Sequence, residues 1–289
     1  DVGVVSTRQA LALDPITAEV TVDGSRSDPI PHILAGIPLK ARDIRVSVDR
    51  PEFTLNPTNC APMAVGASIW GGGIDPFNLA DDSPVTRSQP FQAADCASLG
   101  FKPRISLRLK GGTKRGKFPA LRAELRPRPG DANIRRTVVR LPRSAFLEQG
   151  HFGTICTRVQ FAADACPPGA IYGTVEAFSP LVDEPFRGPI YLRSSSHDLP
   201  DIVFDLKGIV DIEASARVDS HKGGIRATFP AIPDAPINRV VVQMRGGKKG
   251  LIVNSRDLCR RKSRAAIELG AHNGMSVRLN PVVKATGCK

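Results

Sequence analysis

The stretch YLRSSSHDLPD, at residues 191–201, places a serine, a histidine and an aspartate side by side as Ser196, His197 and Asp198. These side chains form the Ser-His-Asp triad of many hydrolases, in which the histidine lies between the nucleophile and the acid. A triad is assembled from segments that converge, whereas neighbouring residues of an extended chain point to opposite faces. The sequence also lacks the GxSxG motif of many serine hydrolases. We therefore expect a turn between strands here, and no catalytic residue in the chain.

The other histidines and the acidic residues give little indication of a metal site. Four histidines are isolated and form no HExxH or HxH pair, namely His32, His151, His221 and His272. The segment DPFNLADDS offers hard oxygen ligands for Ca²⁺ at Asp75, Asn78, Asp81 and Asp82. Its spacing differs from that of an EF-hand, and the glycine of the sharp turn is missing. The pattern favours an Asx-rich loop without metal, with Ca²⁺ as the alternative, and no cofactor is expected.

Two similar basic segments, LKGGTKRGK at 109–117 and MRGGKKG at 244–250, are expected to be hairpin tips. Lysine and arginine at such tips can reach a polyanion. The candidate residues are Lys110, Lys114, Arg115, Lys117, Arg245, Lys248 and Lys249. The alternative is that these are solvated charges that protect the edges of a β-sheet. Nucleic acid is not expected as the partner, because aromatic residues that could stack on bases make up only 5% of the chain.

The net charge of +12 is distributed unevenly along the chain. Residues 1–100 carry 7 basic and 12 acidic side chains, and residues 144–240 carry 8 and 12. Residues 101–143 carry 14 basic and 2 acidic side chains, and residues 241–289 carry 11 and 2. Basic blocks of one copy could therefore face acidic blocks of the next, and such head-to-tail contacts extend into a filament.

Six cysteines, an even number, fit a secreted protein with disulfides. Pairing in sequence order predicts the bonds Cys60–Cys96, Cys156–Cys166 and Cys259–Cys288. The alternative is six buried thiols in a cytosolic protein. No run of about eighteen apolar residues occurs, so no membrane span is expected.

Alternating apolar and polar residues bounded by proline and glycine predict strands. The clearest are at Ile44–Val48, Ile105–Leu109, Thr137–Leu141 and Val240–Met244. The tripeptide HNG at 272–274 predicts a hairpin, because Asn-Gly tolerates positive φ angles. One short helix is expected at Arg143–Gln149.

The chain also resembles itself. IPLKARDIRVSV followed by TLNPTNC resembles IPDAPINRVVVQM followed by LIVNSRDLC, and upstream VVSTRQALALDPITAEVTVDG resembles IVFDLKGIVDIEASARVDS. A different unit lies between these copies, which predicts an A–B–A plan with units at 1–100, 101–208 and 209–289. Each unit is expected to be an Ig-like, Greek-key β-sandwich, so the fold class is all-β. The first residues match the last strand of a B unit, so the chain is expected to be a piece or a repeat of something longer.

Several segments carry a resemblance to a known group of proteins. NPTNCAPMAVGASIWG, FQAADCASLGFKPRISLRLKGG, CPPGAIYGTVEAF and GGKKGLIVNS resemble parts of large secreted, Cys-paired, β-rich repeat proteins of soil actinobacteria. The resemblance covers nearly the whole chain. It implies secretion, and it implies no catalytic residues because the group has no assigned activity.

These patterns predict an extracellular, non-enzymatic structural or cell-surface protein, built as the subunit of a head-to-tail filament. Its expected partners are copies of itself or other cell-surface components. The alternative is a secreted module that binds an anionic polymer, such as a cell-wall polyanion or polysaccharide, through its basic hairpins.

Overall fold

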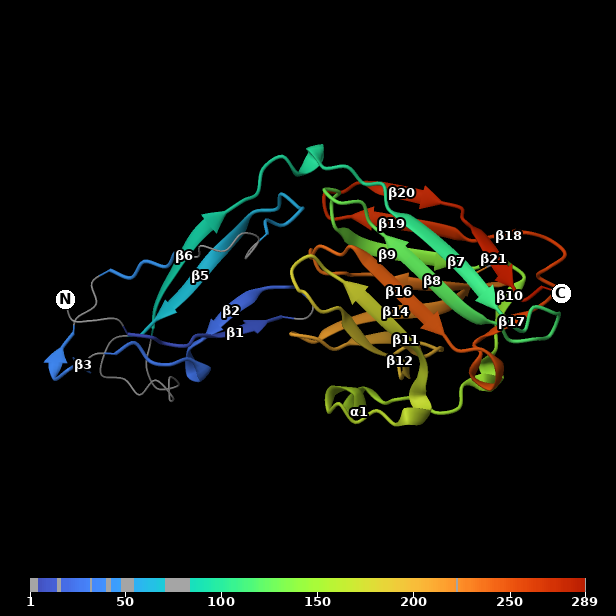
Figure 1. The fold of residues 1–289 in the computed structure, drawn as a ribbon, viewed down its shortest axis with the longest axis horizontal. Coiled ribbons are helices and arrows are strands. Elements are labelled where there is room, and N and C mark those ends of the chain that lie inside the picture. The colour runs from blue at the N-terminus through green and yellow to red at the C-terminus, as the bar shows by residue number, and fades with distance from the viewer. Residues whose placement is uncertain are drawn as a thin grey trace. The chain divides into compact units, whose positions relative to one another are not determined.

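The computed structural model of this 289-residue chain describes residues 5–14, 17–31, 33–39, 43–47, 55–70, 84–221 and 223–288 (Figure 1). The chain divides into two compact units. The first unit comprises Asp1–Asp14, Ala18–Asn56 and Cys60–Ala94, and the second comprises Pro15–Thr17, Pro57–Asn59 and Asp95–Lys289. The described residues are almost entirely β-structure, which confirms the expected all-β class.

The first unit contains three two-stranded hairpins among its described residues. Antiparallel pairs are formed by β1 (Ala10–Leu13) with β2 (Val20–Asp23), β3 (Ile33–Leu34) with β4 (Ile37–Pro38), and β5 (Met63–Ile69) with β6 (Val85–Phe91). The 3-10 helix η1 (Gly24–Arg26) follows β2. The strand expected at 44–48 is wrong for residues 44–47, which have no regular secondary structure, and Val48 lies outside the described residues.

Most strands of the second unit join one 13-stranded sheet, in the order β18-β21-β7-β8-β16-β11-β12-β13-β14-β15-β9-β19-β20. Their bounds are β7 (Arg104–Lys110), β8 (Ala120–Arg126), β9 (Ile134–Arg140), β11 (Ile171–Phe178), β12 (Phe186–Arg193), β13 (Asp201–Leu206), β14 (Ile212–His221), β15 (Gly224–Phe229), β16 (Arg239–Met244), β18 (Ser263–Arg264), β19 (Ala266–Ala271), β20 (Ser276–Leu279) and β21 (Val282–Thr286). Neighbouring strands are antiparallel, except that β21 is parallel to β7.

A few short elements lie outside this sheet. Strands β10 (Ala145–Leu147) and β17 (Ile252–Asn254) form a separate antiparallel pair. The helix α1 (Arg158–Ala162) is the only α-helix among the described residues. The 3-10 helices of this unit are η2 (Cys96–Ser98), η3 (Gln149–His151), η4 (Pro168–Ala170) and η5 (Gly247–Lys249).

The long strand β14 bends the sheet. Its residues Ile212–Ala216 pair with β13, and its residues Arg217–His221 pair with β15. Strands near opposite ends of the order share one apolar core, in which Leu107 of β7 packs in the same cluster as Ile267 and Leu269 of β19. The sheet therefore curls over this core. The Ig-like and Greek-key detail of the expected sandwich stays a prediction.

Strands from the expected B unit and from the expected second A unit alternate in this sheet. Strand β16 lies between β8 and β11, and β9 lies between β15 and β19. The expected boundary between residues 208 and 209 falls between β13 and β14, which are hydrogen-bonded neighbours. Residues 101–208 and 209–288 thus share one sheet and one core, while their assignment to separate units stays a prediction from sequence similarity.

The sequence located several elements of the second unit. The strands expected at 105–109 and 240–244 lie within β7 and β16, and the strand expected at 137–141 overlaps β9. The HNG hairpin is confirmed, since β19 pairs with β20 and Gly274 has a φ of 85°. The helix expected at 143–149 is wrong, because this segment forms β10 by pairing with β17.

The expected disulfides Cys156–Cys166 and Cys259–Cys288 are present, with Cα atoms 5.2 Å and 5.7 Å apart. Cys60 and Cys96 are disulfide-bonded as well. In the described part of the chain, no helix has the length and apolar character needed to cross a membrane.

Candidate polyanion-binding site

The two basic segments that the sequence singles out emerge at the same end of the sheet. Strand β8 lies between β7 and β16 (Figure 1). Lys110, the last residue of β7, faces Ala120, and Met244, the last residue of β16, faces the next residue of β8. Residues 110–117 and 245–249 are therefore neighbours in space, although more than a hundred positions separate them in the chain.

The two segments differ in local structure. Residues 109–117 include the tip of the β7–β8 hairpin, as expected. The expectation of a second hairpin tip at 244–250 is wrong, because the strand that follows, β17, pairs with β10 and not with β16. The second segment is instead a loop that contains η5, and the backbone N–H of Gly247 in this loop donates to the carbonyl of Phe118 at 2.9 Å.

A buried asparagine fixes the shape of the hairpin tip. Asn254 is 1% exposed, and its Nδ2 donates to the Gly112 carbonyl at 2.7 Å. Its backbone N–H donates to the carbonyl of Lys117 at 3.1 Å, and its carbonyl accepts from the N–H of Gly116 at 2.7 Å. Gly112 has a φ of +46°, and a Cβ there would lie 2.8 Å from the Phe118 carbonyl carbon, so the tip requires glycine at this position. Asn254 thus positions the tip that carries Lys114, Arg115 and Lys117.

Lys249 holds the second loop in place. Its Nζ donates to the carbonyls of Gly169 at 2.7 Å and Ile171 at 3.2 Å. The ammonium also lies 5.3 Å from the ring centroid of Tyr172, a cation–π contact. Burial lowers the pKa of Lys249, and the nearby charge of Arg245 lowers it further. Lys249 is therefore tied to the backbone, whereas the other six predicted cations are exposed.

A third basic segment, which the sequence analysis did not single out, adjoins the first two. The N–H of Leu258 donates to the Thr113 carbonyl of the hairpin tip at 2.9 Å, and Cys259 is joined to Cys288. Three exposed cations follow at once. We use the term basic end for the exposed residues Lys110, Lys114, Arg115, Lys117, Arg245, Lys248, Arg260, Arg261 and Lys262. The +9 charge of residues 241–289 was the one signal in the sequence that covered this third segment.

A row of cations leads from the basic end across the exposed face of the sheet. Lys284 of β21 faces Arg108 of β7, Arg108 faces Arg122 of β8, and Arg122 faces Gln243 of β16. Directly opposed residues lie on the same face of a sheet, about 5 Å apart. Like charges in this arrangement destabilise the sheet, and an anion bound along the row would relieve the repulsion.

An open groove of about 260 Å³ continues this row, lined by Gly173, Thr174, Gln243, Met244 and Arg245. Thr174 faces Gln243, and a Cβ on Gly173 would collide with the Gln243 carbonyl, so β11 approaches β16 closely because Gly173 is glycine. Arg245 is the one charged residue among those that line the groove, and Arg122 lies on the next strand.

One carboxylate partly offsets the positive charge of this face. Glu124 forms ion pairs with Arg126 at 2.5 Å and Arg122 at 3.7 Å. The hydrogen bond from Arg126 and the charges of both arginines hold the pKa of Glu124 below its usual value, against a smaller opposing effect of burial. Glu124 is thus ionised at neutral pH, and its two ion pairs are with Arg122 and Arg126.

The sequence analysis also missed the role of Asp234. Its Oδ2 accepts from Thr58 N, Asn59 N and Asn59 Nδ2, and its Oδ1 accepts from Thr58 Oγ1 and Asn133 Nδ2, all at 2.6–3.0 Å. Burial raises the pKa of Asp234, but the hydrogen bonds from Thr58, Asn59 and Asn133 outweigh it and leave the pKa below its usual value. Asp234 therefore fastens residues 57–59 to the loop that precedes β9. This is a structural role and not part of the basic end.

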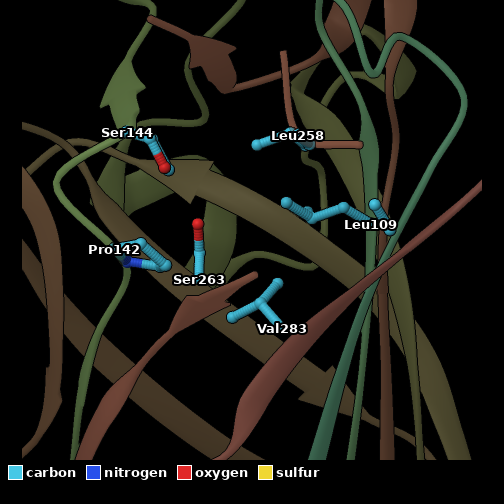
Figure 2. A pocket seen from close by; sticks show the side chains of 8 residues that line it. Leu109, Pro142, Ser144, Leu258, Ser263 and Val283 are labelled. Atoms are coloured by element: carbon cyan, nitrogen blue, oxygen red, sulfur yellow. The ribbon is translucent and has the colours of Figure 1, made fainter. Parts of the chain in front are cut away.

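A small cavity lies in the core near β21 (Figure 2). It measures about 10 Å³ and is lined mainly by apolar side chains, together with Ser144 and Ser263. Such a volume is about that of one water molecule, which is too small for a substrate. The cavity is thus a feature of core packing.

The Ser-His-Asp stretch forms a turn between β12 and β13, as the sequence predicts. Ser195 Oγ lies 2.6 Å from the Leu199 carbonyl oxygen and accepts from the backbone N–H of His197 at 3.2 Å. The ring of His197 contacts Asp201, with Nε2 2.9 Å from Oδ1. The Ser195 hydroxyl therefore bonds to the backbone of its own turn. The acid that contacts the His197 ring is Asp201, and not Asp198, its neighbour in the sequence.

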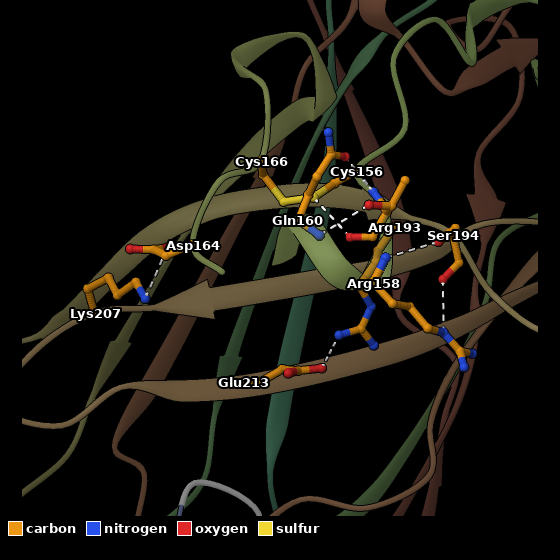
Figure 3. The surroundings of a disulfide bond; sticks show 10 residues. Cys156, Arg158, Gln160, Asp164, Cys166, Arg193, Ser194, Lys207 and Glu213 are labelled. Carbon is orange, nitrogen blue, oxygen red and sulfur yellow. Dashed lines mark hydrogen bonds and ion pairs between the residues drawn. A yellow bond between two sulfur atoms is a disulfide. The ribbon is translucent and has the colours of Figure 1, made fainter. Parts of the chain in front are cut away.

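The neighbouring Cys156–Cys166 disulfide encloses α1 (Figure 3). Thr157 and Gln160 form a capping box at the start of this helix. The N–H of Arg158 donates to Ser194 Oγ at 3.2 Å, so the first serine of the stretch supports the helix. Arg193 donates to Glu213 at 2.6 Å beneath it (Figure 3).

The Ca²⁺ candidates Asp75, Asn78, Asp81 and Asp82 lie outside the described residues. Within the ranges that the structure does describe, no group of three or more His, Cys, Asp or Glu side chains is arranged to hold a metal ion.

Comparison of the chain with protein-family models, with curated proteins and with solved structures finds no match.

Proposed function

We propose that this protein is an extracellular, non-enzymatic β-protein that binds an anionic polymer through its basic end. The observation that carries the proposal is the meeting of three basic segments, remote in sequence, at one end of one sheet. Hydrogen bonds from Asn254 and Lys249 to backbone carbonyls hold two of these segments in fixed shapes. A preformed cationic surface binds with less loss of conformational entropy than separate mobile tips would.

The shape of the surface favours a polymer over a small ligand. Neighbouring strands of a sheet lie about 4.8 Å apart, so Lys284, Arg108 and Arg122 together span about 10 Å. An extended chain with regularly spaced phosphate or sulfate groups can contact several of these cations at once. We therefore expect a phosphorylated or sulfated polysaccharide of a cell surface, and not nucleic acid, because aromatic side chains are scarce.

The extracellular setting rests on the cysteines. All six are disulfide-bonded, which fits an oxidising compartment. The resemblance to secreted, Cys-paired proteins of soil actinobacteria supports the same setting.

A head-to-tail filament is the second candidate function. The uneven charge favours it, because residues 1–100 have five more acidic than basic side chains and could attract the basic end of another copy. In that case, the basic end would bind protein and not a polymer.

Binding of the full chain to dextran sulfate, with neutral dextran as the reference polymer, tests the proposal. The key variant removes four cations of the basic end by the substitutions Lys114→Gln, Arg115→Gln, Lys117→Gln and Lys248→Gln. A matched control removes four exposed cations elsewhere by Arg135→Gln, Arg136→Gln, Arg217→Gln and Arg278→Gln. We expect the first variant to bind at least about tenfold more weakly and the control to change little. Equal loss in both variants would show that net charge alone governs binding.

A further inference from the structure

The first unit exposes apolar side chains along its strands. Val20 and Val22 of β2 are 60% and 56% exposed, and Val65 and Ile69 of β5 are 66% and 56% exposed. Among the described residues of this unit, no apolar side chain is buried. Two-stranded hairpins are marginal in water by themselves, and they gain stability when an apolar face is covered. These strands would therefore gain stability from a further surface that covers them.

The internal repeat provides a direct comparison. In the matched segments AEVTVDG and ASARVDS, Val22 aligns with Val218 and Val20 with Ala216. Val218 is 4% exposed and Ala216 is 0% exposed, whereas both counterparts in the first unit are more than half exposed. Equivalent positions are thus covered in residues 209–289 and uncovered in residues 1–94.

Residues 101–208 supply the cover in the second copy. Val218 belongs to a core cluster that includes Phe101, Leu107 and Ile134. Strand β14 pairs with β13, and β16 is inserted between β8 and β11, so the sheet partners also come from residues 101–208. The first unit has no such partner among its described residues.

The same region of this chain cannot serve both copies. Strands β8, β9, β11 and β13 each have a neighbour on both sides. Their pairing positions beside residues 209–288 are therefore filled.

We propose that the first unit is the docking surface for a further β-region built like residues 101–208, outside the 289 residues of this chain. Its strands would flank those of the first unit as β8, β11 and β13 flank those of residues 209–288. The sequence VVSTRQ ahead of β1 resembles IVFDLK, which ends the region 101–208 and includes most of β13. This inference is independent of polymer binding, since it uses none of the residues of the basic end.

The test extends the full chain by a second copy of residues 101–198 joined ahead of Asp1, so that VVSTRQ takes the place that IVFDLK has ahead of 209–289. Amide hydrogen exchange of β1, β2, β5 and β6 is compared with that of the parent chain. We expect these amides to exchange at least about tenfold more slowly in the extended chain, because covered strands open less often. An extension of equal length made of Gly and Ser is the control, and it should give no protection.

The variant Val22→Asp distinguishes docking from an unspecific effect of length. It should remove the protection in the extended chain and leave the parent chain unchanged, since Val22 is exposed in the parent. Fast exchange throughout the extension and the first unit would overturn the proposal. Protection of these amides in the parent chain itself would also overturn the proposal. Protection that does not depend on protein concentration would mean that the chain's own second unit is the cover. Protection that grows with concentration would mean that a second copy of the chain is the cover.

Discussion

Replacing Asp234 with asparagine should weaken the second unit by about 3 kcal/mol. The carboxylate accepts five hydrogen bonds from Thr58, Asn59 and Asn133. In Asp234→Asn, the amide oxygen can replace Oδ2 and keep its three hydrogen bonds from Thr58 and Asn59. The NH₂ group then replaces Oδ1 and faces another donor, Nδ2 of Asn133. The three hydrogen bonds that remain lose their charged acceptor, which lowers the free energy of unfolding by roughly 1 kcal/mol each. The unsatisfied buried donor lowers it by a further 1–3 kcal/mol. Part of this loss is offset because the variant buries no charge.

Urea and thermal unfolding of the full chain with intact disulfides provide the measurement. For a unit of this size, 3 kcal/mol corresponds to a decrease in Tm of roughly 6–12 °C. The control is Asp211→Asn, which removes a carboxylate that is 63% exposed and pairs with Lys207 at 2.9 Å. An exposed pair of this kind contributes about 0–1 kcal/mol. If Asp234→Asn unfolded within about 0.5 kcal/mol of the parent, the role given to Asp234 would be refuted.

The effect of Asp234 should also depend on pH. Its pKa is lower in the folded chain than the ordinary value of about 3.9 for an unfolded aspartate. The stability it contributes is thus fully present above about pH 4 and is lost as the pH falls through the folded pKa. The difference in stability between the parent and Asp234→Asn should therefore narrow in acid, and a constant difference from pH 7 to pH 2 would contradict the electrostatic explanation.

Three further predictions concern single features of the second unit. Replacing Cys259 and Cys288 with serine should lower the free energy of unfolding by about 3.5 kcal/mol, since the bond closes a loop of 29 positions, and equilibrium unfolding should show this loss. Asn254→Ala should lower the free energy of unfolding by roughly 1–3 kcal/mol and weaken the binding of dextran sulfate, although it removes no charge. Unchanged affinity for dextran sulfate would show that the hairpin tip needs no support from Asn254. Ser195→Ala should lower the free energy of unfolding by about 1 kcal/mol, because the hydroxyl's contacts in the turn are lost. A fluorophosphonate probe should not label Ser195 in the parent chain, and labelling would mean that Ser195 is a nucleophile.

Local patterns in the sequence were enough to find many strands and the disulfides. Alternation in RISLRLK and RVVVQM identified β7 and β16 because one face of each strand is buried. The segment RSAFLEQ was expected to be a short helix. Its pairing with β17 decides otherwise, and that contact depends on residues about a hundred positions away.

The candidate site was predictable in its residues but not in its geometry. Charge and glycine patterns identified both basic segments, yet their meeting depends on the strand order β7-β8-β16, which no local pattern contains. The inward position of Lys249 depends on the carbonyls of Gly169 and Ile171, which the sequence does not reveal. Asp234 was overlooked because an aspartate between two prolines is typical of an ordinary turn.

The salt dependence of polymer binding tests the central claim most directly. Dissociation constants for dextran sulfate are measured between 50 and 200 mM NaCl for the parent, for the variant that lacks four cations of the basic end, and for the control variant that lacks four cations elsewhere. Each cation that contacts a polyanion contributes about 0.7–0.9 to the slope of log affinity against log salt. We predict that the slope of the basic-end variant is smaller than that of the parent by about 3, with the control unchanged. Equal slopes for the parent and the basic-end variant would contradict the claim that this surface binds the polymer.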